Sequence, residues 1–217
     1  MEDMTADIAA IRKEYIQKTF DEKDAAGDPF VQFGRWWREA IDSNIDEVNA
    51  MTLATASADG LPSARIVLLK DYDENGFVFF TNYNSAKGRQ LLENPRACLV
   101  FFWKELERQV RITGSIEKVP AEESDDYFNS RPAGSRIGAW ASSQSSVIAG
   151  RDELEESVKS FTAEFGTGVI PRPAHWGGFR VKPAVIEFWQ GRSNRLHDRL
   201  QYTLTEKGDW KIERLAP

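Results

Sequence analysis

The middle of the chain consists of short apolar runs separated by tight turns, and this feature constrains the fold more than any other. Runs at 51–57, 63–70 and 77–82 are divided by the turn sequences Ala58-Asp-Gly-Leu-Pro62 and Asp73-Glu-Asn-Gly76. Strands spaced this closely are typical of an antiparallel meander. Strictly alternating strand–helix units are absent, so the pattern disfavours a doubly wound parallel sheet.

Helices are expected before and between further strands. Apolar residues recur at helical spacing over 8–16, and Asp28-Pro29 supplies the N-cap and first-turn residues of a second helix. The other expected elements are strands at 97–103, 108–119, 184–189, 196–205 and 210–215, and helices at 85–92, 122–130 and 152–165. These elements predict a mainly β protein with inserted helices (α+β), an antiparallel barrel forming a single domain over 1–217, with 1–45 as an N-terminal helical segment.

Composition narrows the classes of function. The 217 residues carry a formal net charge of -6, which argues against a general nucleic-acid binder. No secretory signal and no run of the roughly 20 apolar residues that span a bilayer is visible, so we expect a cytoplasmic protein with no membrane partner. A single cysteine, Cys98, and no cysteine–histidine cluster predict no metal site. Dinucleotide and Walker A fingerprints are absent as well.

Two segments near the meander place basic and hydroxyl side chains at the ends of elements. Arg65 and Lys70 bracket a strand and point to opposite faces, a pattern that an exposed strand with charged ends also explains. Thr81 and Ser85-Ala-Lys87 lead from a strand end into a helix N-terminus, a place that favours phosphate. A plain N-cap role for Ser85 is the simpler alternative there.

Two later segments have the same character. Tyr127 and Arg131 share a helix face and, with Ser135, are spaced to clamp an anion; an arginine that complements a helix C-terminus is the alternative. Basic side chains alternate in Arg195-Leu-His-Asp-Arg199 and share one face if that segment is a strand, where a solvated face is the alternative. Phosphate-bearing ligands explain all four segments together better than four separate causes do.

Ordered motifs run through nearly the whole chain, from Arg12-Lys-Glu-Tyr15 to the terminal Trp210–Pro217. The most specific are Arg65-Ile-Val-Leu-Leu-Lys70, Leu106-Glu-Arg-Gln-Val110, Ser130-Arg-Pro132, Ile137-Gly-Ala-Trp140, Gln144-Ser-Ser146, Trp176-Gly-Gly-Phe-Arg180, Glu187-Phe-Trp-Gln-Gly191 and Arg195-Leu-His-Asp-Arg199. With these motifs the chain resembles the pyridoxine/pyridoxamine 5'-phosphate oxidases of vitamin B6 metabolism.

The resemblance implies a fold, an assembly and a reaction. The fold would be an FMN-binding split β-barrel of antiparallel Greek-key type, working as a homodimer with FMN at the interface. Residues 174–217 would complete the site and the dimer interface. The reaction would oxidise pyridoxamine 5'-phosphate and pyridoxine 5'-phosphate to pyridoxal 5'-phosphate. Dioxygen would reoxidise the flavin and yield hydrogen peroxide, and the amine substrate would release ammonia.

The resemblance also implies roles for individual residues. The FMN contacts would be Arg65, Ile66, Val67, Leu68, Leu69, Lys70, Phe80, Thr81, Lys87, Gln109, Gln144, Ser145, Trp189 and Arg199. The substrate phosphate would meet Lys70, Tyr127, Arg131 and Ser135. Arg195 and His197 would be the catalytic pair that holds the pyridine ring against the flavin, with Leu196 between them in the substrate site. Arg12, Lys13, Glu14 and Tyr15 would approach the substrate as a mobile cover.

One departure from the family pattern and two other functions complete the expectations. Ala86 precedes Lys87 where many relatives have an arginine, so one phosphate contact is absent here or comes from elsewhere. One alternative is a related split-barrel flavin oxidase acting on another aromatic substrate, such as a phenazine precursor. Arg195-Leu-His197, together with Arg131 and Ser135, favours a phosphorylated pyridine instead. The other alternative is a non-catalytic carrier of flavin or pyridoxal phosphate.

Overall fold

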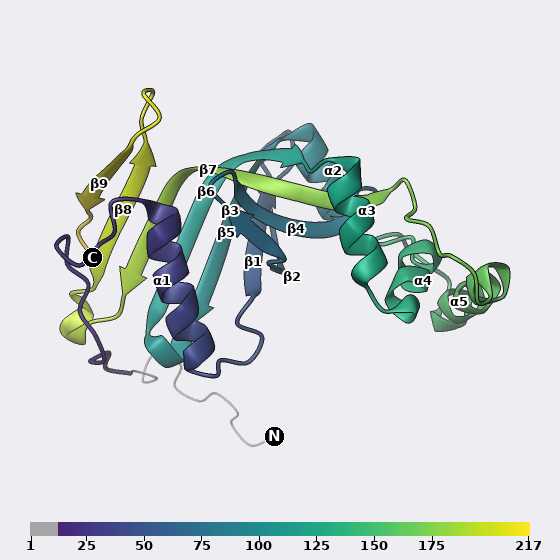
Figure 1. Cartoon of the computed structure of the whole chain (residues 1–217), viewed down its shortest axis with the longest axis horizontal. Coiled ribbons are helices and arrows are strands. Elements are labelled where there is room, and N and C mark those ends of the chain that lie inside the picture. Colours follow the sequence, from purple (N-terminus) through teal and green to yellow (C-terminus); the bar gives the residue numbers. More distant parts are fainter. Residues whose placement is uncertain (1–12) are drawn as a thin grey trace, which may run out of the picture. The chain divides into compact units, whose positions relative to one another are not determined.

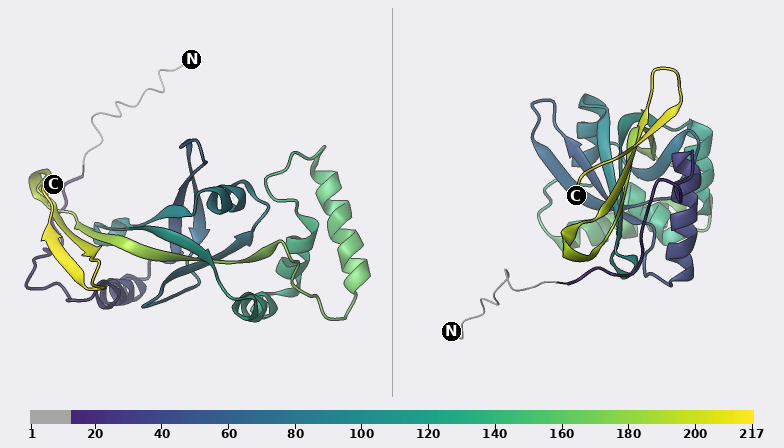
Figure 2. Two further views of the ribbon diagram at one scale, coloured as in Figure 1. Left: turned by 90° about the horizontal axis from the view of Figure 1, so that it is seen from above. Right: turned by 90° about the vertical axis from the view of Figure 1, so that its left-hand side faces the viewer.

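The computed structural model describes residues 13–217, and the chain forms two compact units (Figures 1 and 2). The first unit contains the described part of Met1–Val48 together with Phe102–Arg111 and Val185–Pro217. The second contains Asn49–Phe101 and Ile112–Ala184. Three strands contribute residues to both units, so the expectation of a single domain stays a prediction.

The elements follow the order of the predicted meander with helices inserted after the fourth and sixth strands. The strands are β1 (Ala50–Ala56), β2 (Pro62–Leu68), β3 (Asp71–Asp73), β4 (Gly76–Asn82), β5 (Arg96–Trp103), β6 (Arg108–Lys118), β7 (Trp176–Gln190), β8 (Asp198–Leu204) and β9 (Trp210–Arg214). The helices are α1 (Pro29–Asp42), α2 (Ala86–Glu93), α3 (Ala121–Ser130), α4 (Ala133–Ala141) and α5 (Arg151–Phe165), with 3₁₀ turns at Lys104–Leu106 and Ser193–Arg195.

The strands form one sheet in the order β2-β1-β5-β6-β7-β4-β3, and β8 pairs with both β7 and β9. The pairings β1·β2, β1·β5, β3·β4, β4·β7, β7·β8 and β8·β9 are antiparallel. The predicted class, antiparallel β with inserted helices, is therefore confirmed. Within residues 13–217, no helix is long and apolar enough to cross a membrane.

The first unit is organised around α1 (Figure 1), whose Phe33 meets Trp103 at the end of β5. Asp28 caps this helix as predicted, because its Oδ1 accepts from the backbone N–H groups of Phe30 (2.8 Å) and Val31 (3.0 Å). Trp36 is buried and meets Phe188 of β7 edge to face, with ring centroids 5.3 Å apart. Buried aromatic pairs of this kind dominate the energetics of a core.

The second unit has its core between β1, β4, β5 and β7, where Leu53, Phe79 and Leu99 are fully buried. The turn into β4 requires a glycine, because Gly76 has φ +141° and a Cβ there would lie 2.1 Å from the Val181 carbonyl oxygen. At the far end of this unit α4 and α5 lie side by side (Figure 2).

Three predictions about elements are wrong or incomplete. Residues 13–28 contain no helix, and the rest of the helix predicted at 8–16 lies outside the described residues. The strand predicted at 196–205 begins only at Asp198, because Arg195 adopts a left-handed conformation (φ 62°) in a 3₁₀ turn. Arg195 and His197 therefore precede β8 and do not share a strand face with Arg199.

The remaining differences concern bounds. The strand predicted at 184–189 is the last part of β7, which starts eight residues earlier at Trp176. Lys70 lies beyond β2, which ends at Leu68. Helix α4 was not predicted, since Gly134 and Gly138 lower its intrinsic helix propensity.

Candidate active site

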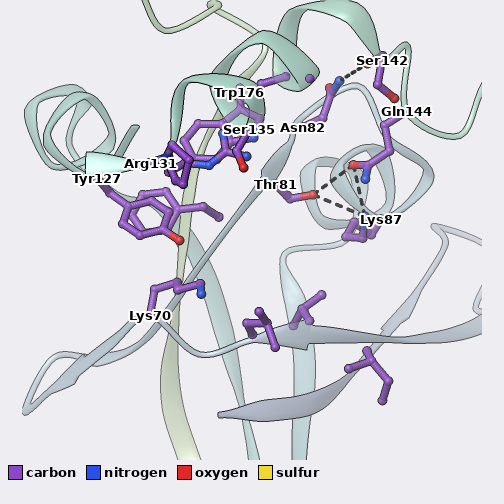
Figure 3. Close-up of a pocket in the computed structure, with 17 residues that line it drawn as sticks. Lys70, Thr81, Asn82, Lys87, Tyr127, Arg131, Ser135, Ser142, Gln144 and Trp176 are labelled. Carbon is purple, nitrogen blue, oxygen red and sulfur yellow. Dashed lines mark hydrogen bonds between the residues drawn. The ribbon is translucent and has the colours of Figure 1, made fainter. Parts of the chain in front are cut away.

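An open pocket of about 670 Å³ lies in the second unit. It is bounded by the ends of β2 and β4, the start of α2, and the helices α3 and α4 (Figure 3). Its lining residues are Ile66, Val67, Leu68, Lys70, Phe80, Thr81, Asn82, Lys87, Tyr127, Arg131, Pro132, Ser135, Gly138, Ala139, Ser142, Gln144 and Trp176. Eleven of the residues predicted for the FMN or substrate sites therefore meet in one cavity, together with others that were not predicted as site residues.

Among the cations that line the pocket, Arg131 has the surroundings that best suit an anionic ligand. It caps the C-terminus of α3, and its guanidinium lies over the Trp176 ring at 4.6 Å. Its Nη1 is buried without a hydrogen-bond partner in the described chain. Burial also lowers the pKa of this guanidinium, because a charge loses solvation inside a protein. A bound anion would satisfy the orphaned donor and offset the lost solvation.

The aromatic platform beside Arg131 fixes the shape of the pocket. Phe80 of β4 stacks on Tyr127 of α3 with ring centroids 4.0 Å apart, and on Trp176 of β7 at 5.6 Å. The Lys70 ammonium lies 6.0 Å from the Tyr127 ring centroid. Ser135 is in the first turn of α4, on the same side of the pocket as Arg131 (Figure 3). The predicted clamp residues thus come together around one apolar floor.

A second polar group lies where β4 turns into α2. Lys87 Nζ donates to Thr81 Oγ1 and to Gln144 Oε1, each at 3.3 Å (Figure 3). Ser85 caps α2, its Oγ accepting from the Gly88 amide at 3.2 Å, so the N-cap reading is confirmed. Burial first, and the charge of Arg65 second, lower the pKa of Lys87. An anion near this helix N-terminus would counter both effects.

Three predicted FMN contacts of the second unit do not line this pocket. The Arg65 guanidinium turns toward β1 and α2 and donates to Thr55 Oγ1 (2.6 Å) and Gln90 Oε1 (3.2 Å). Leu69 is buried in the core. Ser145 has φ 70° and lines a neighbouring cavity of about 170 Å³, which shares Gln144 with the pocket.

Further predicted residues gather in the first unit as three rings, which we call the ring cluster: Tyr15, Trp189 and His197. The Trp189 and His197 centroids are 4.6 Å apart, and Tyr15 meets Trp189 at 5.8 Å and His197 at 6.0 Å. Gly191 lies under Tyr15, where an added Cβ would come within 2.8 Å of the tyrosine Cγ. The cluster therefore depends on a glycine at 191.

The surroundings of His197 fix its neutral tautomer and lower its pKa. Its Nδ1 accepts from the Arg192 backbone N–H at 3.1 Å, so the neutral ring carries its proton on Nε2. Burial, followed by the charges of Arg195 and Arg199, lowers the pKa of the imidazole. His197 is thus a neutral Nε2–H donor at neutral pH.

A buried carboxylate orients the arginine predicted to contact FMN. Glu187 is only 2% exposed, its Oε1 accepts from Arg199 Nε at 2.9 Å, and its Oε2 accepts from Arg111 Nη2. Arg199 also donates to the Ala216 carbonyl at 2.8 Å. Two nitrogens of the Arg199 guanidinium, Nε and Nη1, are therefore held by groups of the protein itself.

The remaining predicted residues of the first unit are described by their exposure to solvent. Gln109 is half-buried in β6, while Lys13, Glu14, Arg195 and Leu196 are exposed. Arg12 lies outside the described residues.

Trp176 lines the pocket under Arg131 but was not predicted as a site residue, although it belongs to one of the motifs. A tryptophan in an apolar strand does not indicate which side chain it will contact. The buried acids Glu107 and Glu187 were not predicted either. Glu107 stands in a polar turn that predicts solvent exposure, and only its place in a specific motif could have drawn attention to it.

Two family models match this chain. One, described as pyridoxamine 5'-phosphate oxidase, matches residues 37–163. The other, described as pyridoxine 5'-phosphate oxidase C-terminal dimerisation region, matches residues 176–217. The matched ranges include both the pocket and most of the ring cluster.

Curated relatives are similar over almost the full chain. A protein of Nostoc sp. named pyridoxine/pyridoxamine 5'-phosphate oxidase is 58% identical over 214 residues, covering 99% of this chain and 100% of that protein. A protein of Cupriavidus pinatubonensis with the same name is 56% identical over 210 residues, covering 97% and 99%.

Solved structures share the fold. The PhzG protein of Burkholderia lata, in complex with tetrahydrophenazine-1-carboxylic acid, is 32% identical with a TM-score of 0.87, covering 93% of this chain and 99% of that one. A pyridoxamine 5'-phosphate oxidase-related, FMN binding protein from Nostoc punctiforme has a TM-score of 0.70 at 16% identity, covering 89% and 100%. This second likeness concerns the fold alone.

Proposed function

The chain belongs to the pyridoxamine 5'-phosphate oxidase family, and from this premise we propose that it oxidises pyridoxamine 5'-phosphate and pyridoxine 5'-phosphate to pyridoxal 5'-phosphate. In this proposal FMN is the cofactor and dioxygen the final oxidant. Hydrogen peroxide is released in both reactions and ammonia in the reaction of the amine. The cytoplasmic location stays a prediction.

The observation that carries the proposal is the cationic pocket of the second unit. Lys70, Lys87 and Arg131 line it, and within residues 13–217 none of them forms an ion pair with a carboxylate. Lys87 and Arg131 are half-buried, and Lys70 is exposed. Cations without acidic partners become costly as they are buried, unless an anionic ligand completes the site. A cavity with several such cations and an aromatic floor suits flat, phosphorylated ligands.

The residues present fit FMN at the end of the pocket near α2. Lys87, Thr81 and the first turn of α2 would hold its phosphate, as a helix N-terminus favours that group. The β2 residues Ile66–Leu68 present an edge of main chain and apolar side chains for the rest of the molecule. When bound, FMN supplies hydride acceptance from the substrate and reoxidation by dioxygen.

The residues around Arg131 would hold the substrate phosphate. Arg131 offers a planar fork whose orientation is fixed by Trp176, and Lys70 adds a second, mobile positive charge. The Tyr127 and Ser135 hydroxyls supply neutral hydrogen bonds. These contacts neutralise a dianion far from the reacting carbon, so they bind and orient the substrate.

Arg195 and His197 would act on the pyridine ring. His197 is a neutral donor at Nε2, so it can hydrogen-bond to a ring substituent without adding a positive charge. Arg195 supplies the charge and the planar surface for stacking. Tyr15 would cover the ring from the N-terminal side.

We also propose that the enzyme is a homodimer, as the name of the C-terminal family model suggests. An obligate interface of this kind buries about 2,000 Å² or more. Sedimentation should show a dimer at micromolar concentration. A monomer that keeps its flavin and its full activity would contradict this part of the proposal.

Anaerobic mixing tests the reaction itself. The purified yellow protein, freed of oxygen, should lose its flavin absorbance on addition of pyridoxamine 5'-phosphate and regain it when air is admitted. A non-catalytic carrier would leave the absorbance unchanged. Chromatography of the released cofactor should give FMN, and recovery of mainly FAD would overturn the cofactor assignment.

The likeness to PhzG supports one competing substrate class, a partly reduced aromatic carboxylate. The same anaerobic experiment with a dihydro- or tetrahydrophenazine carboxylate separates the two classes. Faster bleaching by the carboxylate than by pyridoxamine 5'-phosphate would favour the competing substrate. The relatives named pyridoxine/pyridoxamine 5'-phosphate oxidase, at 56–58% identity, favour the phosphorylated pyridine.

A further inference from the structure

We propose that Glu107 is a positioning residue that holds Tyr15 in place against Trp189 and His197. This inference rests on the proposed function, in which Tyr15 covers the substrate. None of the roles assigned above uses Glu107, and it does not line the pocket. Its place in the fold nevertheless connects the N-terminal segment to the residues beneath Tyr15.

Glu107 occupies an unusual position for a glutamate. It follows the 3₁₀ turn Lys104–Leu106, has a left-handed backbone (φ 54°), and is only 1% exposed. Both features are costly for this residue type, the first through steric strain and the second through lost solvation. Such costs persist where surrounding contacts offset them, so the partners of the carboxylate identify what Glu107 does.

The partners of the carboxylate are backbone amides of the N-terminal segment. Oε2 accepts from the Ile16 N–H at 3.0 Å and from the Gln17 N–H at 3.2 Å. Oε1 lies 3.6 Å from Lys13 Nζ. Hydrogen bonds to an ionised acceptor are roughly twice as strong as neutral ones. The buried charge therefore anchors residues on both sides of Tyr15.

The same residue also holds the surface on which Tyr15 rests. The Glu107 carbonyl accepts from the Gly191 N–H at 2.7 Å and from Gln190 Nε2 at 3.2 Å. Gly191 is the residue whose missing side chain makes room for the Tyr15 ring. The Glu107 side chain thus holds the segment that carries Tyr15, and the Glu107 main chain holds Gly191, against which Tyr15 packs.

A purely structural role for Glu107 would stabilise the fold without acting through Tyr15. A double-mutant cycle separates the two possibilities. In the holoenzyme, Glu107→Gln keeps one acceptor oxygen but removes the charge. It should lower kcat/KM for pyridoxamine 5'-phosphate by about tenfold, as expected when charge assistance is lost from two hydrogen bonds. In a Tyr15→Ala background the same substitution should change kcat/KM by less than about twofold.

Glu105→Gln is the matched control. Glu105 lies in the same turn and is exposed, and within residues 13–217 its carboxylate pairs only with Lys104, so this variant should have wild-type kinetics. An unchanged kcat/KM in Glu107→Gln would overturn the proposal. So would a tenfold loss that persists in the Tyr15→Ala background, because Glu107 would then act by another route.

A measurement that does not depend on the reaction keeps this inference separate from the proposed function. Hydrogen exchange of the Ile16 and Gln17 amides should speed up at least tenfold in Glu107→Gln, while the β1 amides are unaffected. Equal exchange in wild type and variant would overturn the anchor even if the enzyme is active. Lack of wild-type turnover, with this difference present, would overturn the proposed function alone.

A second variant covers the case in which Glu107→Gln does not fold. Ile16→Pro removes one of the two amide donors at an exposed side chain and leaves Glu107 in place. It should lower kcat/KM several-fold, again only when Tyr15 is present. Wild-type kinetics in this variant would equally overturn the proposal.

Discussion

The pocket of the second unit and the ring cluster of the first differ in how their positive charges are balanced. Around the ring cluster, Arg111 and Arg199 share Glu187, and Arg192 pairs with Asp198 at 3.1 Å. In the pocket, Lys70, Lys87 and Arg131 have no such partner in the described chain. The first region is neutralised by the protein itself, whereas the second needs an anion from outside. We therefore expect substitutions to act on folding in the first region and on binding in the second.

The largest expected effect tests the unbalanced pocket. Arg131→Ala should raise KM for pyridoxamine 5'-phosphate by about one to two orders of magnitude, because a charge-assisted hydrogen bond contributes about 1.5–3 kcal/mol. Maximal turnover should fall less, since the contact is remote from the reacting carbon. Steady-state kinetics on the phosphorylated and unphosphorylated amines would measure the difference.

The control for Arg131 is the unphosphorylated substrate. Weak turnover of pyridoxamine should barely change in Arg131→Ala, and Arg131→Met, which keeps an apolar stem over Trp176, should be no less stable than wild type. Equal loss on both amines would show that Arg131 holds the fold or the flavin.

The next effect tests the neutralised region. Glu187→Gln leaves Arg111 and Arg199 without their shared carboxylate and should lower the free energy of unfolding by about 2 kcal/mol. Urea denaturation with an unchanged slope would measure this loss. Glu155→Gln, which breaks the exposed pair with Arg151, should cost less than about 0.5 kcal/mol. If both variants lost the same stability, burial of Glu187 would have no special effect.

Arg195 differs from the other arginines near the ring cluster in having no carboxylate partner in the described chain. Alone among the arginines flanking His197 it forms no ion pair within residues 13–217, and it is exposed with φ 62°. Arg195→Lys keeps the charge and removes the planar fork. We expect kcat/KM to fall about tenfold, with FMN still bound and stability unchanged. Wild-type kinetics would identify Arg195 as a solvated turn residue.

The smallest expected effect is the pH response of His197. Its pKa is lowered in the folded protein, so the unfolded chain binds a proton more readily below about pH 6.5. The neutral ring therefore contributes stability above that pH, and the contribution disappears as pH falls through the folded pKa. A titration followed by NMR should place the His197 pKa below 6.5. Arg195→Gln should raise it, and a pKa above 6.5 in wild type would show that burial and the neighbouring arginines do not lower it.

The two regions also differ in how far the sequence predicted them. The spacing of Tyr127 and Arg131 predicted that they meet, because helix geometry brings residues four apart onto one face. In the structure Arg131 is the C-cap of α3 and Ser135 lies in α4, yet all three line the pocket. The alternation of Arg195, His197 and Arg199 predicted a shared strand face that does not form. Because the backbone at Asn194 and Arg195 is left-handed, the strand starts at Asp198, two residues later than predicted, and the apolar pattern carries no sign of this.

Long-range contacts explain the remaining omissions. Glu107 and Glu187 are buried by segments far away in the sequence, so neither a charge run nor a local period predicts them. The FMN contact that the family resemblance implies for Arg65 stays a prediction, and in this structure its guanidinium bonds to Thr55 and Gln90. A motif identifies a residue but not the rotamer that its neighbours select.

The length of β7, which has fifteen residues, limits where insertions and deletions are tolerated. One end pairs with β4 from Phe77↔Val181 to Asn82↔Trp176, and the other with β8 from Val185↔Thr203 to Gln190↔Asp198. Side chains alternate between faces, so a one-residue insertion or deletion would invert every residue on one side of it. Viable length variants among descendants of this gene should therefore avoid β7 and accumulate in the exposed turn 206–209 between β8 and β9.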